Sequence, residues 1–357
     1  MLDDKNGGKR LTKAQFTIRT FKPRDIPRLY RLQRVGLYLD LERYFVSGYA
    51  SLRVAVAGWV HNDTCTYLTR STHDSHWHVL QIVRRDDRPE WEVTFLAPVT
   101  ASTPLDMEQW RALLERAVND AVHKGVYRLY AALPVSSPFV DVFQYTGFRL
   151  YSKEVILRGQ APSQITPLPL GRLRERTEED EWEFRRLWRR VTPQVVVAAE
   201  GLTAQNSLGI PYSWTDRPDQ QVYVWEGEGT LWGAVAIRSG HRGRWVRFLI
   251  DQEADEGVWA FVTQALHLAS QGHRGAIYCA VPEYVGGLRQ PLEDLDFVPL
   301  MERGWMVRHL ALPLQADVAV TQGVLSLLDV GGEPAFTQPL DQAEALLFRE
   351  EAEKAGC

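Results

Sequence analysis

The chain of 357 residues is poor in cysteine and contains no long apolar segment. Its three cysteines, Cys65, Cys279 and Cys357, are odd in number, lie far apart and form no C-x-x-C pair. Neither a disulfide framework nor a thiolate zinc site is therefore expected. No apolar run approaches the roughly 18 residues of a membrane span, and the polar N-terminus lacks the apolar core of a signal peptide. We expect a cytoplasmic protein that does not bind membranes.

An excess of positive charge is also absent, because 41 Lys and Arg face 45 Asp and Glu, for a net charge of −4. Without a basic field we expect no nucleic-acid binding. The chain does have the balance of a globular protein, with 45% hydrophobic and 24% charged residues. Its 12 Trp, 13 Tyr and 13 Phe can fill large cores, and its length predicts two or three folding units.

Common short catalytic motifs are missing as well: there is no Ser-His-Asp hydrolase elbow, no Walker loop and no dinucleotide-binding fingerprint. His73, His76 and His78 form an H-x-x-H-x-H pattern, which would place His76 and His78 on one face of a strand, as metal ligands can be. Only Asp74 accompanies them, so a polar strand face is the favoured interpretation. We expect no metal.

The sequence does contain an internal repeat. Pro and Gly are dense over residues 158–171, which indicates a linker between two halves of similar size. Each half has an amphipathic helix with apolar residues at i, i+3, i+4, i+7, i+8 and i+11. These residues are Trp110, Leu113, Leu114, Ala117, Val118 and Ala121, and, 148 residues later, Val258, Phe261, Val262, Ala265, Leu266 and Ala269. A short apolar strand ending in Pro follows at the same offset, over 129–134 and 277–282, which supports a duplication.

Further segments complete a similar order in both halves. Alternating residues at 91–96 and 245–250 predict a strand before each long helix. Because strands precede and follow a long central helix in each half, we predict a mixed α/β sheet in two tandem domains. The predicted boundaries are a flexible N-terminus over 1–14, domains over 15–160 and 172–315, a linker over 161–171, and a C-terminal extension over 316–357. The extension carries an amphipathic tail helix, which is a candidate contact of a homodimer.

This order of elements resembles the GNAT superfamily of acyl-CoA N-acyltransferases, as a tandem pair. The specific local match is Phe143-Gln-Tyr-Thr-Gly-Phe148, which is similar to the family's tyrosine-containing segment ending in Gly-Phe. Its counterpart in the second half, Leu292-Glu-Asp-Leu-Asp-Phe297, has Asp296 in place of the glycine. The resemblance implies acetyl-CoA or another acyl-CoA as co-substrate and a small-molecule or peptide amine as acceptor.

Members of the family bind the coenzyme A pyrophosphate through a glycine-containing loop ahead of the long helix, where backbone N–H groups meet the phosphates. The equivalent stretch, 97–106, has no glycine, and Asp106 would repel phosphate while capping the helix together with Thr103. By the resemblance, the candidate coenzyme contacts are Leu96, Ala97, Val99, Thr100, Ser102 and Thr103. In the second half, carboxylates line the equivalent turn, so we expect no coenzyme there. These carboxylates belong to Asp251, Glu253, Asp255 and Glu256.

In the family's usual scheme a base takes a proton from the amine, and a tyrosine hydroxyl protonates the departing thiolate. The tyrosine position holds Phe143 here, and Leu292 in the second half, neither of which can donate a proton. The remaining candidates are Tyr145 as the acid and Glu92 as the base. Each also has a structural interpretation: a helix tyrosine with its hydroxyl in water, and a solvated strand carboxylate.

In the second half, Glu283 and Tyr284 are candidate ligand-binding residues, because they follow the strand where the family's sheet splays open. The adjacent Gly286 and Gly287 are also a plain turn signal. Two functional hypotheses remain open. The first is an N-acyltransferase, typically an acetyltransferase, with its activity in the N-terminal half. The second is a catalytically inactive, degenerate acyltransferase fold that acts as a scaffold or binds a small molecule or protein.

Overall fold

The computed structural model describes residues 16–48, 50–61, 64–71, 76–85, 88–99, 103–169, 171–200, 210–251, 253–254 and 257–310. Thr100 and Ser102 lie outside the described residues, as do the predicted terminal segments 1–14 and 316–357 and the dimer contact assigned to the second of them. None of the described helices is long and apolar enough to cross a membrane.

The first half of the chain alternates short helices with strands before and after one long helix. Its elements are β1 (Phe16–Thr20), α1 (Ile26–Leu32), β2 (Leu37–Tyr38), α2 (Leu41–Ser47), α3 (Ser51–His61), β3 (Thr64–Ser71), β4 (Trp77–Arg84), β5 (Glu90–Ala97), α4 (Pro104–His123), β6 (Arg128–Pro134), α5 (Phe139–Tyr145) and β7 (Arg149–Gly159).

The second half repeats this order. Its elements are β8 (Arg172–Glu175), α6 (Glu181–Val191), α7 (Gln194–Glu200), β9 (Gln220–Gly227), β10 (Thr230–Ser239), β11 (Gly243–Ile250), α8 (Val258–Ser270), β12 (Ala276–Pro282), α9 (Arg289–Asp294) and β13 (Val298–His309). The predicted repeat of helix and strand is therefore α4 with β6 and α8 with β12.

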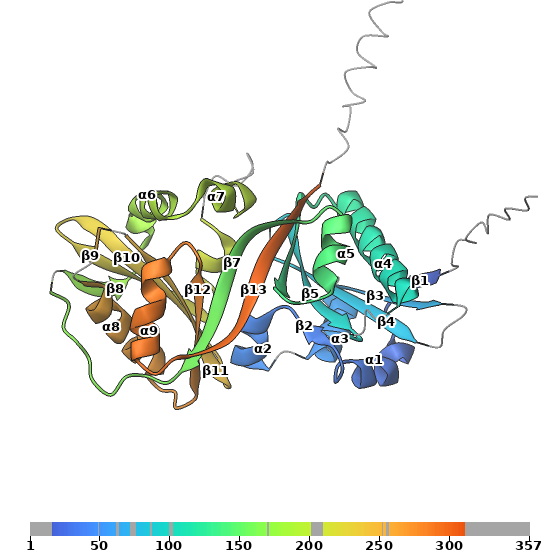
Figure 1. Cartoon of the computed structure of the whole chain (residues 1–357), viewed down its shortest axis with the longest axis horizontal. Helices are drawn as coiled ribbons and strands as arrows, with labels where there is room; N and C mark the ends of the chain where they lie inside the picture. The colour runs from blue at the N-terminus through green and yellow to red at the C-terminus, as the bar shows by residue number, and fades with distance from the viewer. Residues whose placement is uncertain are drawn as a thin grey trace, which may run out of the picture. The chain divides into compact units, whose positions relative to one another are not determined.

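Strands of both halves join in one sheet. In the described part of the chain it has thirteen strands, in the order β1-β3-β4-β5-β6-β13-β7-β12-β11-β10-β9-β8, with β2 paired to β5 (Figure 1). The β5–β6 and β11–β12 pairs are parallel and the other pairs antiparallel, which confirms the predicted mixed α/β class.

The two halves exchange their last strands. The final strand of the first half, β7, pairs with β12 of the second half, and the final strand of the second half, β13, pairs with β6 of the first. β7 and β13 also pair with each other. The described residues consequently form one compact unit, and the predicted boundary over 161–171 separates no sheet. The division into two domains stays a prediction about evolutionary and folding units.

A repeated ion pair anchors the start of each half. Arg19 Nη2 donates to Asp25 at 2.6 Å, and Arg174 Nη2 donates to Asp180 at 2.7 Å. Each carboxylate also accepts a backbone N–H three residues earlier, at 3.0 Å in the first half and 2.8 Å in the second. The same arginine and aspartate, six residues apart, thus hold the same turn between opening strand and first helix twice. This shared detail supports the duplication that the sequence predicts.

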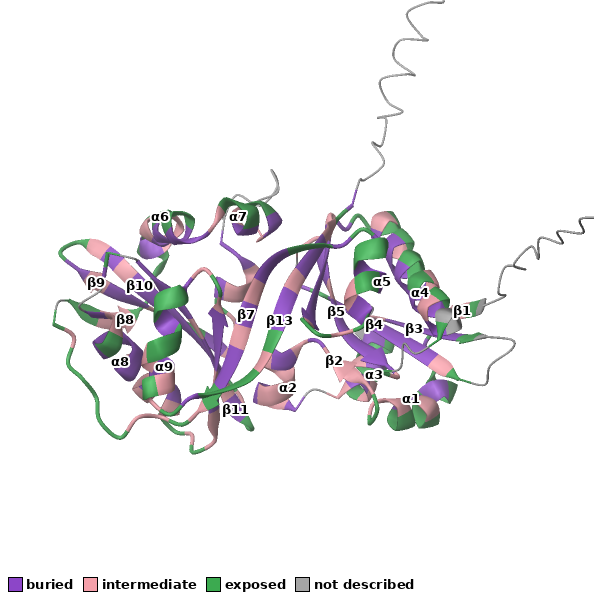
Figure 2. Cartoon of the chain, viewed as in Figure 1, coloured by how far each residue is buried: buried purple, intermediate pink, exposed green. Residues whose placement is uncertain are grey.

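Helices cover both faces of the sheet because alternate strand residues point to opposite sides. On β3, Tyr67 lies in the core beneath α4 and the adjacent Leu68 lies in the core beneath α1 and α3. In the second half, α8 covers one face and α6 the other. Figure 2 shows the strands largely buried and the outer sides of the helices exposed.

The sheet opens at the carboxyl end of each parallel pair. β5 and β6 are paired from Glu90 with Arg128 to Val93 with Ala131, although both strands continue beyond this point. β11 and β12 likewise part after Arg247 and Ala280. In the first half β2 lies along the edge of β5 that β6 leaves, because β4 occupies the opposite edge. The candidate site described below lies at these openings.

Candidate functional site

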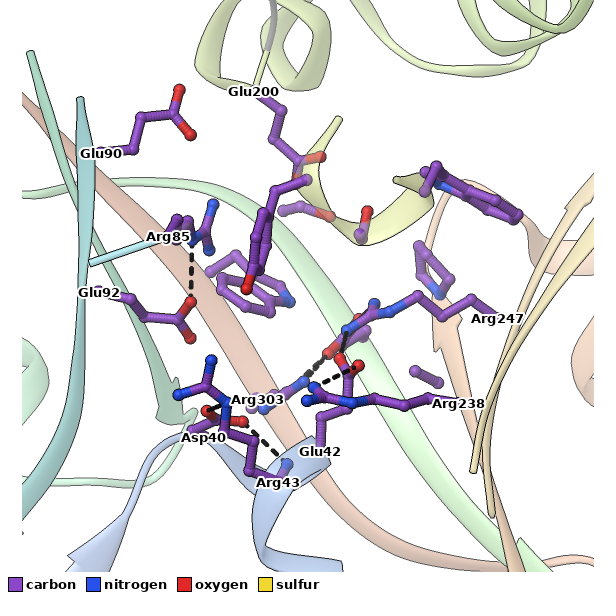
Figure 3. Close-up of a pocket in the computed structure, with 18 of the residues that line it drawn as sticks. Asp40, Glu42, Arg43, Arg85, Glu90, Glu92, Glu200, Arg238, Arg247 and Arg303 are labelled. Atoms are coloured by element: carbon purple, nitrogen blue, oxygen red, sulfur yellow. Dashed lines mark hydrogen bonds and ion pairs between the residues drawn. The ribbon is translucent and has the colours of Figure 1, made fainter. Parts of the chain in front are cut away.

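A central cavity lies where the two halves meet in the sheet. Its walls come from α2 and β5 of the first half, from β10, β11 and α7 of the second, and from the exchanged strands β7 and β13. Charged side chains dominate the lining (Figure 3). They include Asp40, Glu42, Arg43, Arg85, Glu90, Glu92, Glu154, Glu200, Arg217, Arg238, Arg247 and Arg303.

Glu42 of α2 is the centre of the largest charge cluster in this cavity. It accepts hydrogen bonds from Arg238 at 3.0 Å, from Arg247 at 3.2 Å and from Arg217 at 3.4 Å. Burial by itself would raise the pKa of Glu42, but the three positive charges outweigh it and hold the pKa far below its usual range. Glu42 is therefore ionised and paired with three arginines from the second half.

Glu154 of β7 is held in the same way by arginines. Arg303 of β13 donates to it from Nε at 2.6 Å, and Arg247 lies 3.4 Å away. Burial favours the neutral carboxyl, but the charges of Arg303 and Arg247 lower the pKa of Glu154 below its usual range. The exchanged strands thus carry a buried ion pair across their shared ladder.

Two carboxylates of the cavity are engaged differently. Glu92 on β5 accepts one hydrogen bond, from Nε of Arg85 at 2.9 Å, through Oε2. Glu200, at the end of α7, accepts the hydroxyl of Tyr151 at 2.9 Å. Burial raises the pKa of Glu200, and the positive charge of Arg85 offsets this only in part. Figure 3 shows Glu92 and Glu200 pointing into the same space from different elements.

Neither a family model nor a curated protein matches the sequence. Solved structures do match in fold. A GCN5-related N-acetyltransferase from Sphaerobacter thermophilus is 12% identical, with a TM-score of 0.52, over 82% of this chain and 95% of that chain.

The chain has the fold of the GCN5-related N-acetyltransferases. Two further solved structures with lower TM-scores are similar to it. A tandem GNAT protein from the clavulanic acid biosynthesis pathway has a TM-score of 0.48 and 12% identity, over 84% of this chain and all (100%) of that chain. A putative acetyltransferase from Pyrococcus horikoshii has a TM-score of 0.45 and 13% identity, over 87% of this chain and 95% of that chain.

Within this GCN5-related fold, the predicted catalytic residues lie in different places. Glu92 lines the central cavity, where it is partly buried beside Arg85 rather than solvated on an open strand face. Tyr145 is 67% exposed on α5, and its ring lies under the guanidinium of Arg111 at 4.1 Å. It does not line the cavity. The structure therefore does not bring Tyr145 and Glu92 together.

Phe143, at the family's tyrosine position, is fully buried and packs against Phe148 with ring centroids 4.9 Å apart. Its ring belongs to the core beneath α4 and does not face the cavity. Leu292 is equally buried, in the core beneath α8. Both positions are filled by packing residues.

The predicted coenzyme turn is closed by a helix cap. Thr103 Oγ1 accepts the N–H of Asp106 at 3.1 Å, and Asp106 accepts the N–H and the hydroxyl of Thr103 at 3.1 and 2.8 Å. The predicted cap is thereby confirmed. Leu96 and Ala97 are buried, and the N–H of Val99 is bound to the carbonyl of Val35 at 3.0 Å.

A pyrophosphate at this helix end would meet the Asp106 carboxylate, and two of the first N–H groups already have acceptors. The described residues of this turn therefore do not fit the pyrophosphate of coenzyme A. The second-half turn is also acidic, since the buried Asp251 is paired with Arg190 and accepts the N–H of Glu253 at 3.2 Å. Asp255 and Glu256 lie outside the described residues.

The two ligand-binding candidates of the second half also differ. Tyr284 lines the central cavity, and burial raises the pKa of its hydroxyl. Glu283 is exposed and does not line the cavity, although its N–H donates to the carbonyl of Lys153 at 2.9 Å. Among the described residues, no group of three His, Cys, Asp or Glu side chains could hold a metal ion. His78 is buried against Trp110, His76 is exposed, and His73 lies outside the described residues.

Sequence reasoning missed most of the residues that build the cavity. Glu42, Glu154 and Glu200 come from three segments whose patterns show only ordinary helix or strand periodicity. Arg85 follows directly after β4 and is only 7% exposed, which is rare for an arginine. No signal in the sequence marks it as buried, because its environment comes from β6, β13 and the segment before β9.

Proposed function

We propose that the chain is an N-acyltransferase, which moves an acyl group from an acyl-CoA to an amine of a small molecule or peptide held in the central cavity. One observation carries the proposal. Glu92 and Thr94, at the opening of the first half, and Phe248 and Pro282, at the opening of the second, line the same cavity. The openings of both parallel strand pairs thus lie at one polar cavity, and this cavity contains the carboxylate of Glu92.

Glu92 is the proposed base. Arg85 engages Oε2 of its carboxylate and leaves Oε1 with no hydrogen-bond donor among the described residues. An acceptor amine in the cavity can pass a proton to this oxygen, which makes the nitrogen nucleophilic. Arg85 keeps the carboxylate in place during the transfer. We assign no residue to protonation of the thiolate.

A binding protein without acyl transfer is the second candidate. Three observations favour it: β2 fills the edge of β5 at the first opening, Asp106 closes the start of α4, and Phe143 replaces the tyrosine. Each removes one contact that an acyl-CoA would use. In this candidate the cavity keeps its ligand and the fold serves as a scaffold.

Release of the coenzyme A thiol from acetyl-CoA, measured with the full chain and a panel of small amines, tests the proposal. Amine-dependent thiol release supports acyl transfer. A second measurement is thermal unfolding with acetyl-CoA, where a ligand at a hundredfold excess over its Kd adds about 2.7 kcal/mol of stability. Saturable amine binding with neither thiol release nor an acetyl-CoA shift would instead support the binding protein.

Three finer assignments belong to this proposal. The reaction takes place in the cytoplasm. Residues 15–160 and 172–315 are the two duplicated domains, and the C-terminal extension over 316–357 carries the contact of a homodimer. Light scattering of the full chain and of a chain ending at Leu312 tests the last assignment, because loss of a dimer on truncation is the expected result.

A further inference from the structure

We propose that Arg85 binds a carboxylate of the ligand in the central cavity, so that the acceptor is an amino acid or a similar small molecule with both a carboxylate and an amine. The inference rests on the proposed function only in naming the cavity as the acceptor site. It is carried by a buried guanidinium whose hydrogen-bonding capacity the described residues leave largely unused.

Arg85 is fixed in position from several sides. Its backbone N–H donates to the carbonyl of Glu90 at 2.9 Å, and its guanidinium lies 3.8 Å from the ring centroid of Tyr130. The rings of Tyr212 and Trp305 lie 5.3 and 5.7 Å away. These aromatic rings attract the positive charge and help to hold the guanidinium in place. The side chain is thus a rigid donor group and not a mobile surface arginine.

Most donors of Arg85 have no acceptor among the described residues. Its Nε donates to Glu92, but within the described part of the chain neither Nη group has a hydrogen-bond acceptor. Other arginines of the cavity are engaged through their Nη groups: Arg247 reaches Glu42 and Glu154, and Arg303 reaches Glu154. All three arginines line the cavity, and Arg85 is the one among them whose Nη groups have no acceptor among the described residues. A buried donor of this kind requires an acceptor, and a ligand can supply one.

The planar fork of a guanidinium matches the two oxygens of a carboxylate, which it binds through two parallel hydrogen bonds. A phosphate dianion fits this place less well, because Glu92 and Glu200 project into the same space. Those two carboxylates instead suit a positive group on the same ligand. A molecule with one carboxylate and one ammonium group therefore matches both signs of charge around Arg85.

The same arrangement agrees with acyl transfer to nitrogen. Arg85 joins the two functions, since its Nε holds Glu92 and its Nη groups face the ligand. A carboxylate bound at Arg85 would place the amine of a short amino acid on the side of the cavity that contains Glu92. Arg85 is in this view a substrate-binding residue that also positions the base.

Isothermal titration of the full chain without an acyl donor tests the inference. The probes are glycine, L-glutamate, L-lysine and 4-aminobutyrate, each compared with the matching compound in which the carboxylate is a neutral carboxamide. We expect saturable binding of at least one amino acid and binding at least about tenfold weaker for its carboxamide. In Arg85→Gln the affinity for the amino acid should fall to that of the carboxamide.

Two further variants separate recognition from folding. Arg85→Lys keeps the charge but loses the planar fork, so binding should be weakened without being abolished. Arg289→Gln changes an exposed arginine of α9 that does not line the cavity and should leave affinity unchanged. Equal affinity for acid and carboxamide, undiminished binding in Arg85→Gln, or no saturable binding of any of the four amino acids would overturn the inference.

The two measurements distinguish a failure of this inference from a failure of the proposed function. Carboxylate binding that requires Arg85, without thiol release from acetyl-CoA, would refute acyl transfer and leave the inference standing. Thiol release with amines that lack a carboxylate, together with equal affinity for acid and carboxamide, would support acyl transfer and refute the inference.

Discussion

Glu42 and Glu92 both line the central cavity, yet their surroundings give them different chemistry. Three arginines hold Glu42 as an anion, with a donor on each of its two carboxylate oxygens. Glu92 has one arginine neighbour and one carboxylate oxygen that faces the cavity without a donor among the described residues. A carboxylate can act as a base only when one of its oxygens is accessible to a proton donor. At the scale of residues, the candidate base is therefore Glu92.

Replacement of Glu92 by Gln tests this assignment. The amide oxygen can still accept the hydrogen bond from Arg85, so the arginine should stay in place, but the proton acceptor is lost. We expect kcat for amine-dependent thiol release to fall roughly 10²- to 10⁴-fold, with KM for the amine little changed. Glu92→Asp, which keeps the carboxylate, should retain more activity than Glu92→Gln. Full kcat in the Gln variant would exclude Glu92 as the base.

At the scale of elements, the start of α4 joins stability to function. Thr103 and Asp106 satisfy each other's backbone N–H groups and so complete the first turn of the helix. The same carboxylate turns a helix end that would attract anions into one that repels them. The cap therefore stabilises α4 while it occupies the turn that the sequence resemblance assigns to the coenzyme pyrophosphate.

Removal of the capping hydroxyl should be measurable as a loss of stability. In Thr103→Ala the N–H of Asp106 loses its acceptor, so we expect the free energy of unfolding to fall by about 1 kcal/mol. Urea unfolding followed by circular dichroism measures the change. Thr103→Ser keeps the hydroxyl and serves as the control, with stability close to that of the unchanged chain. Identical unfolding midpoints for all three chains would show that the cap contributes nothing.

The local spacing of apolar residues predicted the long helices well, because this spacing reflects which side of a helix is buried. The apolar stripe that begins at Trp110 predicted α4, and the one that begins at Val258 predicted α8. The exchange of β7 and β13 was not predicted. Both halves end in strands of similar pattern, and nothing in such a strand specifies which of two similar neighbours it pairs with.

Of the four predicted catalytic and ligand-binding side chains, two line the central cavity. Glu92 and Tyr284 line the cavity, whereas Tyr145 and Glu283 do not. The remaining cavity charges come together across long sequence separations, as with Glu42 and Arg247, which are 205 positions apart in the chain. Such pairs produce no periodic pattern in the sequence. They also do not show in the net charge of −4, because opposite charges cancel in that sum.

At the scale of the whole molecule, buried charge and exchanged strands connect the two halves. Glu42 belongs to α2 of the first half, and its arginines belong to the second: Arg238 on β10, Arg247 on β11 and Arg217 just before β9. The pair of Glu154 with Arg303 joins β7 to β13. Separation of the halves would expose these charges and break the ladders of both exchanged strands. We therefore expect the described unit to unfold as a whole.

The charge of Glu42 should appear in the dependence of stability on pH. Its pKa is lowered in the folded chain, so its contribution is complete above the unfolded pKa of about 4.3 and is lost as the pH falls below that value. Glu42→Gln leaves three buried arginines without their carboxylate, and we expect a loss of about 3–5 kcal/mol at pH 7. Because the titrating group is gone, this loss should shrink as the pH is lowered from 5 towards 3. Urea unfolding of both chains across this range measures the effect.

Glu115→Gln, which removes an exposed partner of Arg111, is the matched control and should change stability by less than about 1 kcal/mol at every pH. If the arginines depend on this buried carboxylate, its removal must lower the free energy of unfolding. A Glu42→Gln chain as stable as the control at pH 7 would therefore show that the cluster does not hold the halves together.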